Sequence, residues 1–588
     1  MALAVAPMLL LHILRTEPRE AVCNTIIMEV SFAASYGSHM VLQQAPARAS
    51  VWGFAPSDVT AVSVALAGGS GSHKPMQASL QRFNSSALTW SLLLPAIAAT
   101  RREDGSAVAY QITASATGKT VTSASIEDVL FGEVWICSGQ SNMAFLVEMA
   151  FGGREFVQDA NNHPEIRLFT TRKLTAGAPL TELGQLTNKG AWVDGVELPW
   201  SVASNVSISQ NNGHTPAGAN DDNWLYMSAV CYLFGKELQA ARKVPVGLMN
   251  TNWGGTAIQD WMPAAAMDDC KHSLSAGATS PRVATHLYNA MIAPLRNHTV
   301  AGAVWYQGES NSGSPAAYSC QLPAMVRRWR EAWGGDTNRT SALPFGVVQL
   351  AGDVDEKNPT ALPVFRWLGQ TQEYGTLPNP KIPNSFLATA HDLGDATSPY
   401  GSVHCRNKKE VGQRLALGAR RVAYRETGVS AGPVIKSAVM DASKRQLLLT
   451  FEGVGPAGLA LYPMNISRVH NMTHWTGMTP FELCFTSNAG HQEREATEED
   501  LCSSAGRFDG WSEAPHMRLG ADGESVILDG FDAAAASAEG FRSPAAVRYA
   551  WRAYPCEVLG CGVYTKIGDA LVPPATFHMR VGGGGGAA

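Results

Sequence analysis

Three clusters of small and polar residues could supply the groups that acyl-transfer chemistry requires. In the first cluster, Ser141 lies just beyond the apolar segment 133–137, and Gly139 precedes it. A serine on a tight turn at the end of a strand exposes its hydroxyl, and its own backbone N–H can point at an oxyanion that develops during attack on a carbonyl. The cluster does not have the Gly-x-Ser-x-Gly pattern of the α/β-hydrolase nucleophile elbow.

The other two clusters offer hydrogen-bond donors. Gly254 and Gly255 follow a second apolar segment, and glycines let the backbone N–H groups approach a ligand closely. Gln307 and Asn311 follow a third apolar segment, and their side-chain amides could donate to an oxyanion. Each cluster alone is also typical of an ordinary turn, and Glu309 alone is typical of a structural hydrogen-bonding residue.

The segments before these clusters have the pattern of buried parallel strands. Continuous apolar runs alternate with helical spacing, and the runs lie at 133–137, 244–249, 300–306, 345–350 and 386–390, with helices predicted over 223–242 and 407–426. This alternation predicts an α/β fold whose parallel sheet is covered on both faces. Polar residues that follow the strands then meet at the carboxyl edge of the sheet.

The chain is too long for one hydrophobic core, because a core rarely serves more than about 250–300 residues. Both flanks of the α/β region have short Val-, Thr- and Ala-rich runs broken by Gly, Ser and Pro, which is typical of β structure. We predict a signal peptide over 1–25, β-rich domains over 26–126 and 431–580, an α/β domain with inserted loops over 127–430, and a disordered Gly/Ala tail over 581–588.

Composition excludes several classes of partner. Apolar residues make up 45% of the chain and charged residues 16%, as expected of a globular protein with a large core. The net charge of −5 is spread thinly, so neither a nucleic-acid surface nor a polybasic membrane patch is expected. No Cys/His cluster has zinc spacing, and we expect no structural metal.

The N-terminus predicts export. The apolar run at 2–14 has the length of a signal-peptide core and is shorter than the roughly 20 residues that span a bilayer. No other segment is apolar for long enough to be a membrane span. Asn-x-Ser/Thr sequons, which are candidates for glycosylation, occur at Asn84, Asn205, Asn297, Asn338, Asn465 and Asn471. These features predict a secreted or lysosomal protein.

The ten cysteines also suit an oxidising compartment. Cys556 and Cys561 are five residues apart, and Cys484 and Cys502 flank a polar loop, so each pair could close a small disulfide loop. A cysteine such as Cys231, within an apolar run, is typical of a buried small hydrophobic residue.

Taken in order, the motifs resemble the SGNH hydrolases, and more closely the sialic acid O-acetylesterases and their acetyl-xylan esterase relatives. The resemblance covers roughly residues 30–575. It is carried by Gly37-Ser-His-Met-Val-Leu-Gln-Gln, Gly132-Glu-Val-Trp-Ile-Cys-Ser-Gly-Gln-Ser-Asn-Met, Ser228-Ala-Val-Cys-Tyr-Leu-Phe-Gly, Trp253-Gly-Gly-Thr, Val304-Trp-Tyr-Gln-Gly-Glu-Ser-Asn, Pro399-Tyr-Gly-Ser-Val-His-Cys-Arg-Asn-Lys-Lys-Glu-Val, Tyr549-Ala-Trp and Tyr554-Pro-Cys. It implies an SGNH-type, flavodoxin-like parallel sheet flanked by β-rich, sandwich-like domains.

The resemblance also implies roles for individual residues. Ser141 would be the nucleophile and His404 its general base, since an imidazole with a pKa of about 6.5 suits proton transfer near neutral pH. The oxyanion hole would consist of the Ser141 N–H, an N–H of Gly254 or Gly255, and the Gln307 side chain, with Asn311 as the alternative amide. The implied reaction removes O-acetyl groups from sialic acids through an acetyl-serine and needs no cofactor.

The sequence departs from the pattern around the histidine. SGNH hydrolases usually have an aspartate two or three residues before it, where this chain has Ser402 and Gly401. Asp392 or Asp395 could supply the orienting acid, or a backbone carbonyl could hold the imidazole in a Ser-His dyad, which we favour. A further departure is Cys405, at a position where relatives commonly have proline.

Two alternatives to a sialate esterase remain open on the sequence. An acetyl-xylan or other polysaccharide acetylesterase would use the same catalytic motifs. A catalytically impaired esterase core could instead act as a carbohydrate-binding protein, and the departures around His404 keep that possibility open.

Overall fold

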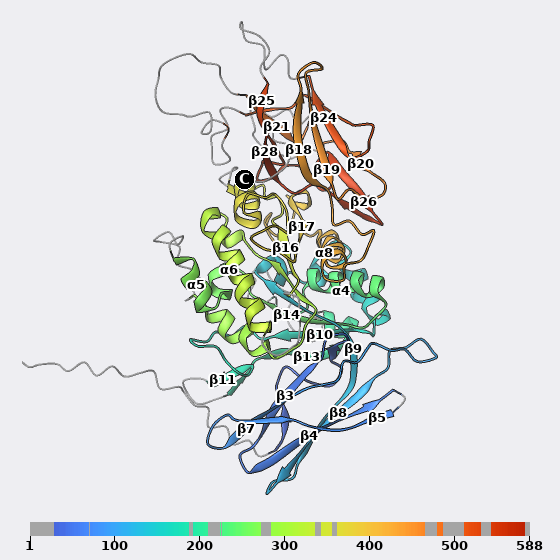
Figure 1. The fold of residues 1–588 in the computed structure, drawn as a ribbon, viewed down its shortest axis with the longest axis vertical. Coiled ribbons are helices and arrows are strands. Elements are labelled where there is room, and N and C mark those ends of the chain that lie inside the picture. Colours follow the sequence, from blue (N-terminus) through green and yellow to red (C-terminus); the bar gives the residue numbers. More distant parts are fainter. Residues whose placement is uncertain are drawn as a thin grey trace, which may run out of the picture.

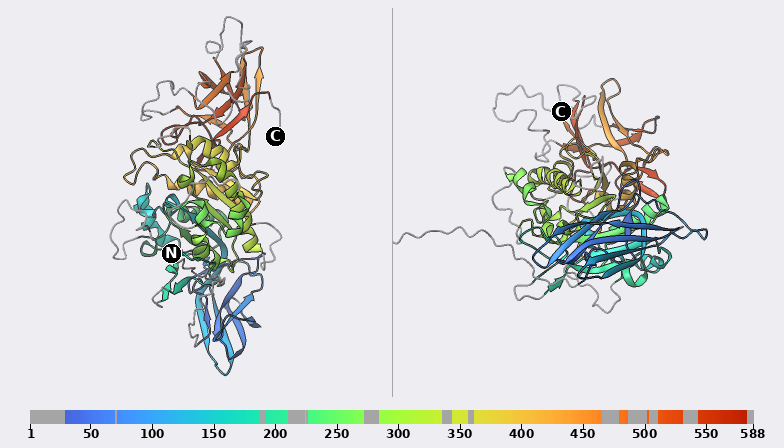
Figure 2. Two further views of the ribbon diagram at one scale, coloured as in Figure 1. Left: turned by 90° about the vertical axis from the view of Figure 1, so that its left-hand side faces the viewer. Right: turned by 60° about the horizontal axis from the view of Figure 1, so that its bottom comes forward.

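The protein has three regions stacked along its long axis, with the N-terminal β region at one end and the C-terminal β region at the other (Figures 1 and 2). The computed structural model describes residues 29–69, 71–186, 192–209, 224, 226–271, 284–334, 343–355, 361–464, 479–485, 502, 511–530 and 543–582. The predicted signal peptide, most of the predicted tail and the sequons at Asn338, Asn465 and Asn471 lie outside the described residues.

A parallel sheet forms the centre of the middle region. Its order is β13-β10-β14-β9-β15-β16-β17, in which only β13 runs antiparallel to its neighbour. From β14 to β17 the strands have the chain order 2-1-3-4-5, which is that of flavodoxin-like sheets, and β10 and β13 extend the sheet beyond β14. The bounds are β9 Ser123–Gly139, β10 Ile166–Thr171, β13 Val196–Val202, β14 Val246–Asn252, β15 Gly302–Tyr306, β16 Phe345–Gln349 and β17 Ser385–Thr389.

Helices cover both faces of this sheet (Figure 1). On one face, Trp135 of β9 packs against Phe234 of α4, and on the other, Trp305 of β15 packs against Trp329 of α6. Within the described ranges, no helix combines the length and the apolar character needed to cross a membrane. The α-helices are α1 Ser141–Ala144, α2 Gly153–Asp159, α3 Asn205–Ile208, α4 Ala229–Arg242, α5 Ala264–Asp269, α6 Pro315–Gly334, α7 Ala361–Val364 and α8 Lys408–Val422.

The N-terminal region consists mainly of antiparallel strands, although β2 pairs in parallel with β9, and it shares one long strand with the central sheet. The first half of β9 pairs with β8, and its second half lies between β14 and β15. The boundary that we predict at residue 126 therefore falls inside a continuous strand. The remaining strands here are β1 Ser31–Phe32, β2 Val41–Gln43, β3 Ser50–Pro56, β4 Val59–Gly68, β5 Gly71–Gln77, β6 Ser79–Arg82, β7 Ala87–Leu93 and β8 Tyr110–Gly118.

Among its described residues, the C-terminal region has three small antiparallel sheets, with the orders β18-β19-β24-β23, β20-β26-β27 and β22-β21-β25-β28. Its strands are β18 Val434–Asp441, β19 Gln446–Glu452, β20 Leu459–Leu461, β21 Phe481–Phe485, β22 Trp511–Glu513, β23 His516–Leu519, β24 Ser525–Asp529, β25 Pro544–Tyr549, β26 Val563–Ile567, β27 Ala570–Val572 and β28 Phe577–Arg580. A separate hairpin in the middle region pairs β11 Gly184–Leu186 with β12 Trp192–Asp194.

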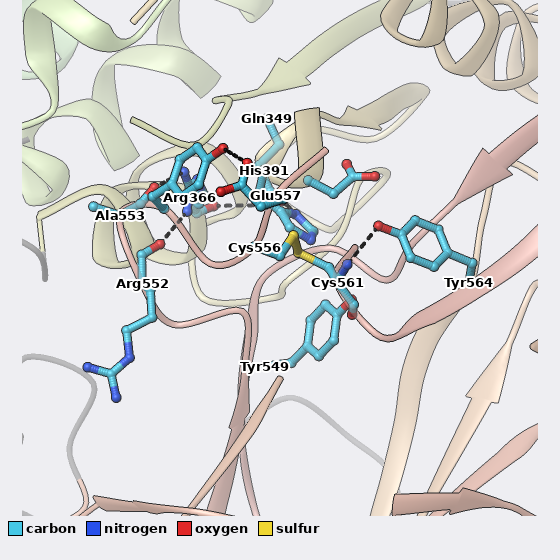
Figure 3. The surroundings of a disulfide bond; sticks show 12 residues. Gln349, Arg366, His391, Tyr549, Arg552, Ala553, Cys556, Glu557, Cys561 and Tyr564 are labelled. Carbon is cyan, nitrogen blue, oxygen red and sulfur yellow. Dashed lines mark hydrogen bonds between the residues drawn. A yellow bond between two sulfur atoms is a disulfide. The ribbon is translucent and has the colours of Figure 1, made fainter. Parts of the chain in front are cut away.

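A buried arginine joins the C-terminal region to the central sheet. Arg366 is fully buried and donates to the carbonyls of Leu350 and Ala351 on the sheet side and of Arg552 and Ala553 on the other. Figure 3 shows this guanidinium beside the loop that the Cys556–Cys561 disulfide closes. Because a buried charge needs partners, these carbonyls fix the loop against the ends of the central strands.

Four disulfides are present among the described residues. Cys484–Cys502 and Cys556–Cys561 are the two pairs that the spacing suggests. Cys137–Cys231 and Cys270–Cys320 join segments that are far apart in the chain. The interpretation of Cys231 as a lone buried residue is thus wrong, because its partner in β9 is 94 residues away.

Candidate active site

A glycine allows the chain to turn sharply at the end of β9. Gly139 has φ +146°, and a Cβ atom there would lie 2.1 Å from the carbonyl oxygen of Tyr306 in the neighbouring strand β15. A larger residue would therefore separate the two strands. The chain then enters α1, whose first residue is Ser141, so the hydroxyl lies at the carboxyl edge of the sheet.

The structure brings Ser141 and His404 together. The Ser141 Oγ lies 2.8 Å from the His404 Nε2, and the His404 Nδ1 lies 2.7 Å from the carbonyl oxygen of Tyr400. A carbonyl only accepts, so the imidazole hydrogen is on Nδ1, and Nε2 can accept from the serine hydroxyl. A histidine in this tautomer can take the proton that a serine must lose to become a nucleophile.

An aromatic cluster packs against the imidazole. Trp224 is 1% exposed and meets His404 edge to face, with ring centroids 5.2 Å apart. Phe145 packs in the same manner against both Trp224 and Tyr400. The Trp224 ring, which Phe145 holds in place, therefore limits rotation of the imidazole.

The structure does not bring Asp392 to His404. Its two carboxylate oxygens accept from Arg414 Nη1 at 2.6 Å and Nη2 at 2.8 Å, and both side chains are fully buried. Arg414 also donates to the carbonyl of Leu571 in the C-terminal region. The expectation that Asp392 could orient the base is corrected by this geometry, because the guanidinium occupies both of its oxygens in a structural ion pair.

Asp395 is also engaged elsewhere. Its carboxylate accepts from Arg406 Nε at 2.6 Å and Nη2 at 3.0 Å, and from the hydroxyl of Thr397 at 3.1 Å. These bonds tie together the two ends of the loop that carries His404. Of the two carboxylates that the sequence offers, neither is placed on the imidazole, whereas a backbone carbonyl is.

The residues that replace the usual aspartate stabilise the turn before His404. Gly401 has φ +92°, a conformation that favours glycine, and its carbonyl accepts from the His404 N–H at 2.9 Å. Ser402 donates to the Asp355 carboxylate at 2.8 Å and to that of Asp353. The departures from the family pattern are thus parts of a hydrogen-bonded turn.

Two of the predicted oxyanion donors lie beside the nucleophile. The N–H of Ser141 is the first of α1, a position that has no acceptor within the helix. Gly254 and Gly255 form the turn after β14, which pairs with β9, and the Trp253 N–H donates to the Gly139 carbonyl at 3.1 Å. The backbone after β14 therefore runs next to the turn that carries Ser141.

Gln307 donates its amide hydrogens to neighbouring protein groups. Its Nε2 lies 2.8 Å from Asn311 Oδ1, 3.1 Å from Gln140 Oε1 and 3.2 Å from the Thr256 carbonyl, and the side chain is fully buried. An amide nitrogen has two hydrogens, and these three acceptors take both. The Gln307 amide thus ties together the three segments that follow the strands. Asn311 gives one amide hydrogen to Gln259 at 3.1 Å.

Sequence reasoning missed a polar cluster next to Ser141 and His404. Asn142 donates to Glu309 Oε1 at 2.6 Å and to the Val403 carbonyl at 2.9 Å, and it accepts from Lys408 Nζ at 2.5 Å. Burial raises the pKa of Glu309 and lowers the pKa of Lys408, while the two opposite charges counteract these shifts. All these residues lie inside the motifs that carry the family resemblance. The sequence therefore shows where they are in the chain, but not which of them form hydrogen bonds with one another.

No group of three or more metal-ligating side chains is found in the part of the chain that the structure describes. The chemistry of the site is that of a hydroxyl, an imidazole and amide donors, which is sufficient for ester hydrolysis.

A serine and a histidine within hydrogen-bonding distance at the carboxyl edge of a parallel sheet have the arrangement of an ester hydrolase, and comparison with known proteins makes the class more specific. Residues 131–420 match the family model described as carbohydrate esterase, sialic acid-specific acetylesterase. The chain is 32% identical to the sialate O-acetylesterase of Rattus norvegicus over 94% of each chain. It is also 32% identical to that of Homo sapiens, over 92% of this chain and 91% of the human one. The protein is a carbohydrate esterase, and it belongs to the sialate O-acetylesterase family.

A solved structure is similar along the whole chain. A carbohydrate acetylesterase from Xanthomonas citri has a TM-score of 0.64 and 26% sequence identity, and the match covers 94% of this chain and 99% of that one. The two proteins therefore have similar overall folds, and in this chain the fold is mixed α/β, with a large mixed sheet and several small antiparallel sheets.

Proposed function

We propose that this protein removes O-acetyl groups from sialic acids, with Ser141 as nucleophile and His404 as general base. The observation that supports this most strongly is the 2.8 Å hydrogen bond between Ser141 Oγ and His404 Nε2, which joins side chains 263 residues apart. The names of the curated relatives support the choice of substrate.

Acylation begins when Ser141 Oγ attacks the acetyl carbonyl carbon and its proton passes to His404 Nε2. The tetrahedral oxyanion then collapses, the bond to the sugar oxygen breaks, and the imidazolium returns its proton to that oxygen. The products of this half-reaction are a free sugar hydroxyl and an acetyl-serine.

Deacylation repeats these steps with water. Water attacks the acetyl carbonyl and gives a proton to Nε2, and collapse of the second tetrahedral intermediate releases acetate and restores the Ser141 hydroxyl. The Tyr400 carbonyl keeps the other hydrogen on Nδ1 throughout, at 2.7 Å. A backbone carbonyl thus takes the orienting role that an aspartate has in a triad.

The oxyanion would be stabilised by backbone donors. The N–H of Ser141 and the N–H of Gly254 or Gly255 lie on adjacent turns of the sheet edge, and the side-chain amide of Gln307, with Asn311 as the alternative, is the further candidate donor. Losing one such donor typically costs roughly 10²–10³ in turnover.

We also propose that the protein acts outside the cytosol, in a secretory or lysosomal compartment. The disulfides among the described residues favour an oxidising environment. The sequons at Asn84 and Asn205 lie on partly exposed or exposed positions that a glycan could reach.

Acetate release from defined O-acetylated sugars tests the proposal. Wild-type protein should release acetate from O-acetylated sialic acid, and Ser141→Ala should reduce the rate by a factor of about 10⁴ or more. Faster release from acetylated xylan would assign a polysaccharide substrate instead. Glycan binding with no release from any acetylated sugar would indicate an impaired esterase that acts as a binding protein.

A further inference from the structure

The buried polar cluster beside the catalytic pair connects the two reacting segments. Asn142 directly follows Ser141 in the chain, and Val403 directly precedes His404. A hydrogen bond of 2.9 Å joins the Asn142 Nδ2 to the Val403 carbonyl. This side chain therefore links the segment that carries the nucleophile to the segment that carries the base, over a separation of 261 residues.

The charges on either side of Asn142 fix the orientation of its amide. Lys408 Nζ can only donate and lies 2.5 Å from Oδ1, whereas the Glu309 carboxylate lies 2.6 Å from Nδ2. A rotation of the amide by 180° would place its NH₂ group on the ammonium and its oxygen on the carboxylate. Only one orientation is compatible with both neighbours, and in it the second N–H points at Val403.

The surroundings of Lys408 keep its ammonium in place. The side chain is fully buried, and Nζ lies over the rings of Phe145 at 4.8 Å and Tyr306 at 5.1 Å from their centroids. The Cys405 thiol lies 3.6 Å from Nζ. Aromatic faces and a thiol solvate an ammonium less well than water does, so the Asn142 carbonyl oxygen is a strong local partner.

We propose that Asn142, held between Lys408 and Glu309, is a positioning residue that sets the distance between the nucleophile and the base. It acts through the Val403 carbonyl, so it need not touch the substrate. The proposal rests on the function proposed above, in that Ser141 and His404 must be the reacting pair. A displacement of about 1 Å between reacting groups can lower a rate by about 10².

The first test is Asn142→Asp, which keeps the size and the acceptor for Lys408 but removes both amide hydrogens. With an aryl acetate as substrate, we expect kcat to fall by about 10–100-fold and KM to change by less than about threefold. The rate at which an organophosphonate labels Ser141 should fall by the same factor, since labelling also requires the base. That second readout needs no natural substrate, so it separates failure of this proposal from failure of the sialate assignment.

Asn379→Asp is the matched control. Asn379 is also buried, and its amide nitrogen donates to the Thr371 carbonyl, to Gln372 and to the Thr376 carbonyl, in a loop outside the cluster. The control should lower the thermal midpoint and leave kcat per folded molecule unchanged. An Asn142→Asp variant that lowers the midpoint but keeps kcat within threefold of wild type would overturn the proposal.

Lys408→Met provides an independent variant, including the case in which Asn142→Asp does not fold. It removes the ammonium but keeps an apolar stem between the two rings, and kcat should again fall with little change in KM. In the double variant the losses should not multiply, because both substitutions disrupt one unit. Fully multiplicative losses, or a rise in KM at constant kcat, would contradict the proposal.

Discussion

The substitution Asp392→Asn distinguishes between two possible roles of this carboxylate, which are orientation of His404 and structural pairing with Arg414. If it orients His404, Asp392→Asn should lower kcat by about 10⁴, as loss of a triad aspartate does. If it is the structural partner of Arg414, the substitution leaves a fully buried guanidinium without its counter-charge, which costs about 3–5 kcal/mol of stability. We expect the second result, with kcat per folded molecule within about threefold of wild type.

The stability loss can be converted to a shift in the thermal midpoint. At about 2–4 °C per kcal/mol for a domain of some 150–250 residues, the midpoint should fall by roughly 6–20 °C. The assay combines thermal unfolding with kcat measured well below the midpoint, and organophosphonate labelling gives the fraction of active molecules. That normalisation is needed because an unfolded fraction would otherwise mimic a loss of kcat.

Asp395→Asn is the matched control. Asp395 pairs with Arg406, whose side chain is 21% exposed, so water can replace part of the lost interaction. Its substitution should cost about 1–3 kcal/mol and also leave kcat nearly unchanged. If Asp392→Asn turned over about a thousandfold or more slowly than wild type with the active fraction intact, our reasoning would be refuted, and Asp392 would be placed against the base in solution.

Three further changes have outcomes that follow from the structure. Gly139→Ala should abolish aryl acetate hydrolysis and lower the thermal midpoint, because its Cβ would lie 2.1 Å from a backbone oxygen; a fully active variant would contradict this. Burial lowers the pKa of His298 to about 3, so the folded protein disfavours the protonated imidazole. The neutral imidazole therefore stabilises the folded state fully above the unfolded pKa of about 6.5, and this stabilisation is lost as the pH falls toward 3. His298→Gln should therefore reduce the stability lost between pH 7.5 and pH 5 by about 2 kcal/mol, measured by denaturant unfolding, and an unchanged loss of stability over this pH range would contradict the expectation. Replacing Cys137 and Cys231 with alanine opens a loop of 94 residues and should cost up to about 4 kcal/mol of stability, with an unchanged midpoint as the contrary result.

The elements that position the site could be predicted because their signals are local. Apolar runs bounded by polar turns identify five of the central strands, whereas β10 and β13 were not predicted. Helical spacing over 407–426 corresponds to α8 at Lys408–Val422. The structure also places Ser141 and His404 together, as the ordered motifs imply. Such patterns depend on residue type and spacing, which the sequence contains in full.

The hydrogen-bond partners of the site could not be predicted in this way. The group that holds His404 is the carbonyl of Tyr400, and every residue has a carbonyl, so no residue type marks it. Asp392 has suitable chemistry for the role we gave it, but the guanidinium of Arg414 binds both of its carboxylate oxygens. Asn142 is the opposite case, because its residue type alone suggests no special role. Its orientation is fixed by two buried neighbours, the Lys408 ammonium and the Glu309 carboxylate.

Mapping of organophosphonate labelling by peptide mass spectrometry tests the Ser141–His404 pair most directly. We predict one label per wild-type molecule, on Ser141, with none on Ser141→Ala and at least about 10³-fold slower labelling of His404→Ala. Labelling of a different serine, or equally fast labelling of the histidine variant, would contradict the claim that this pair performs the reaction.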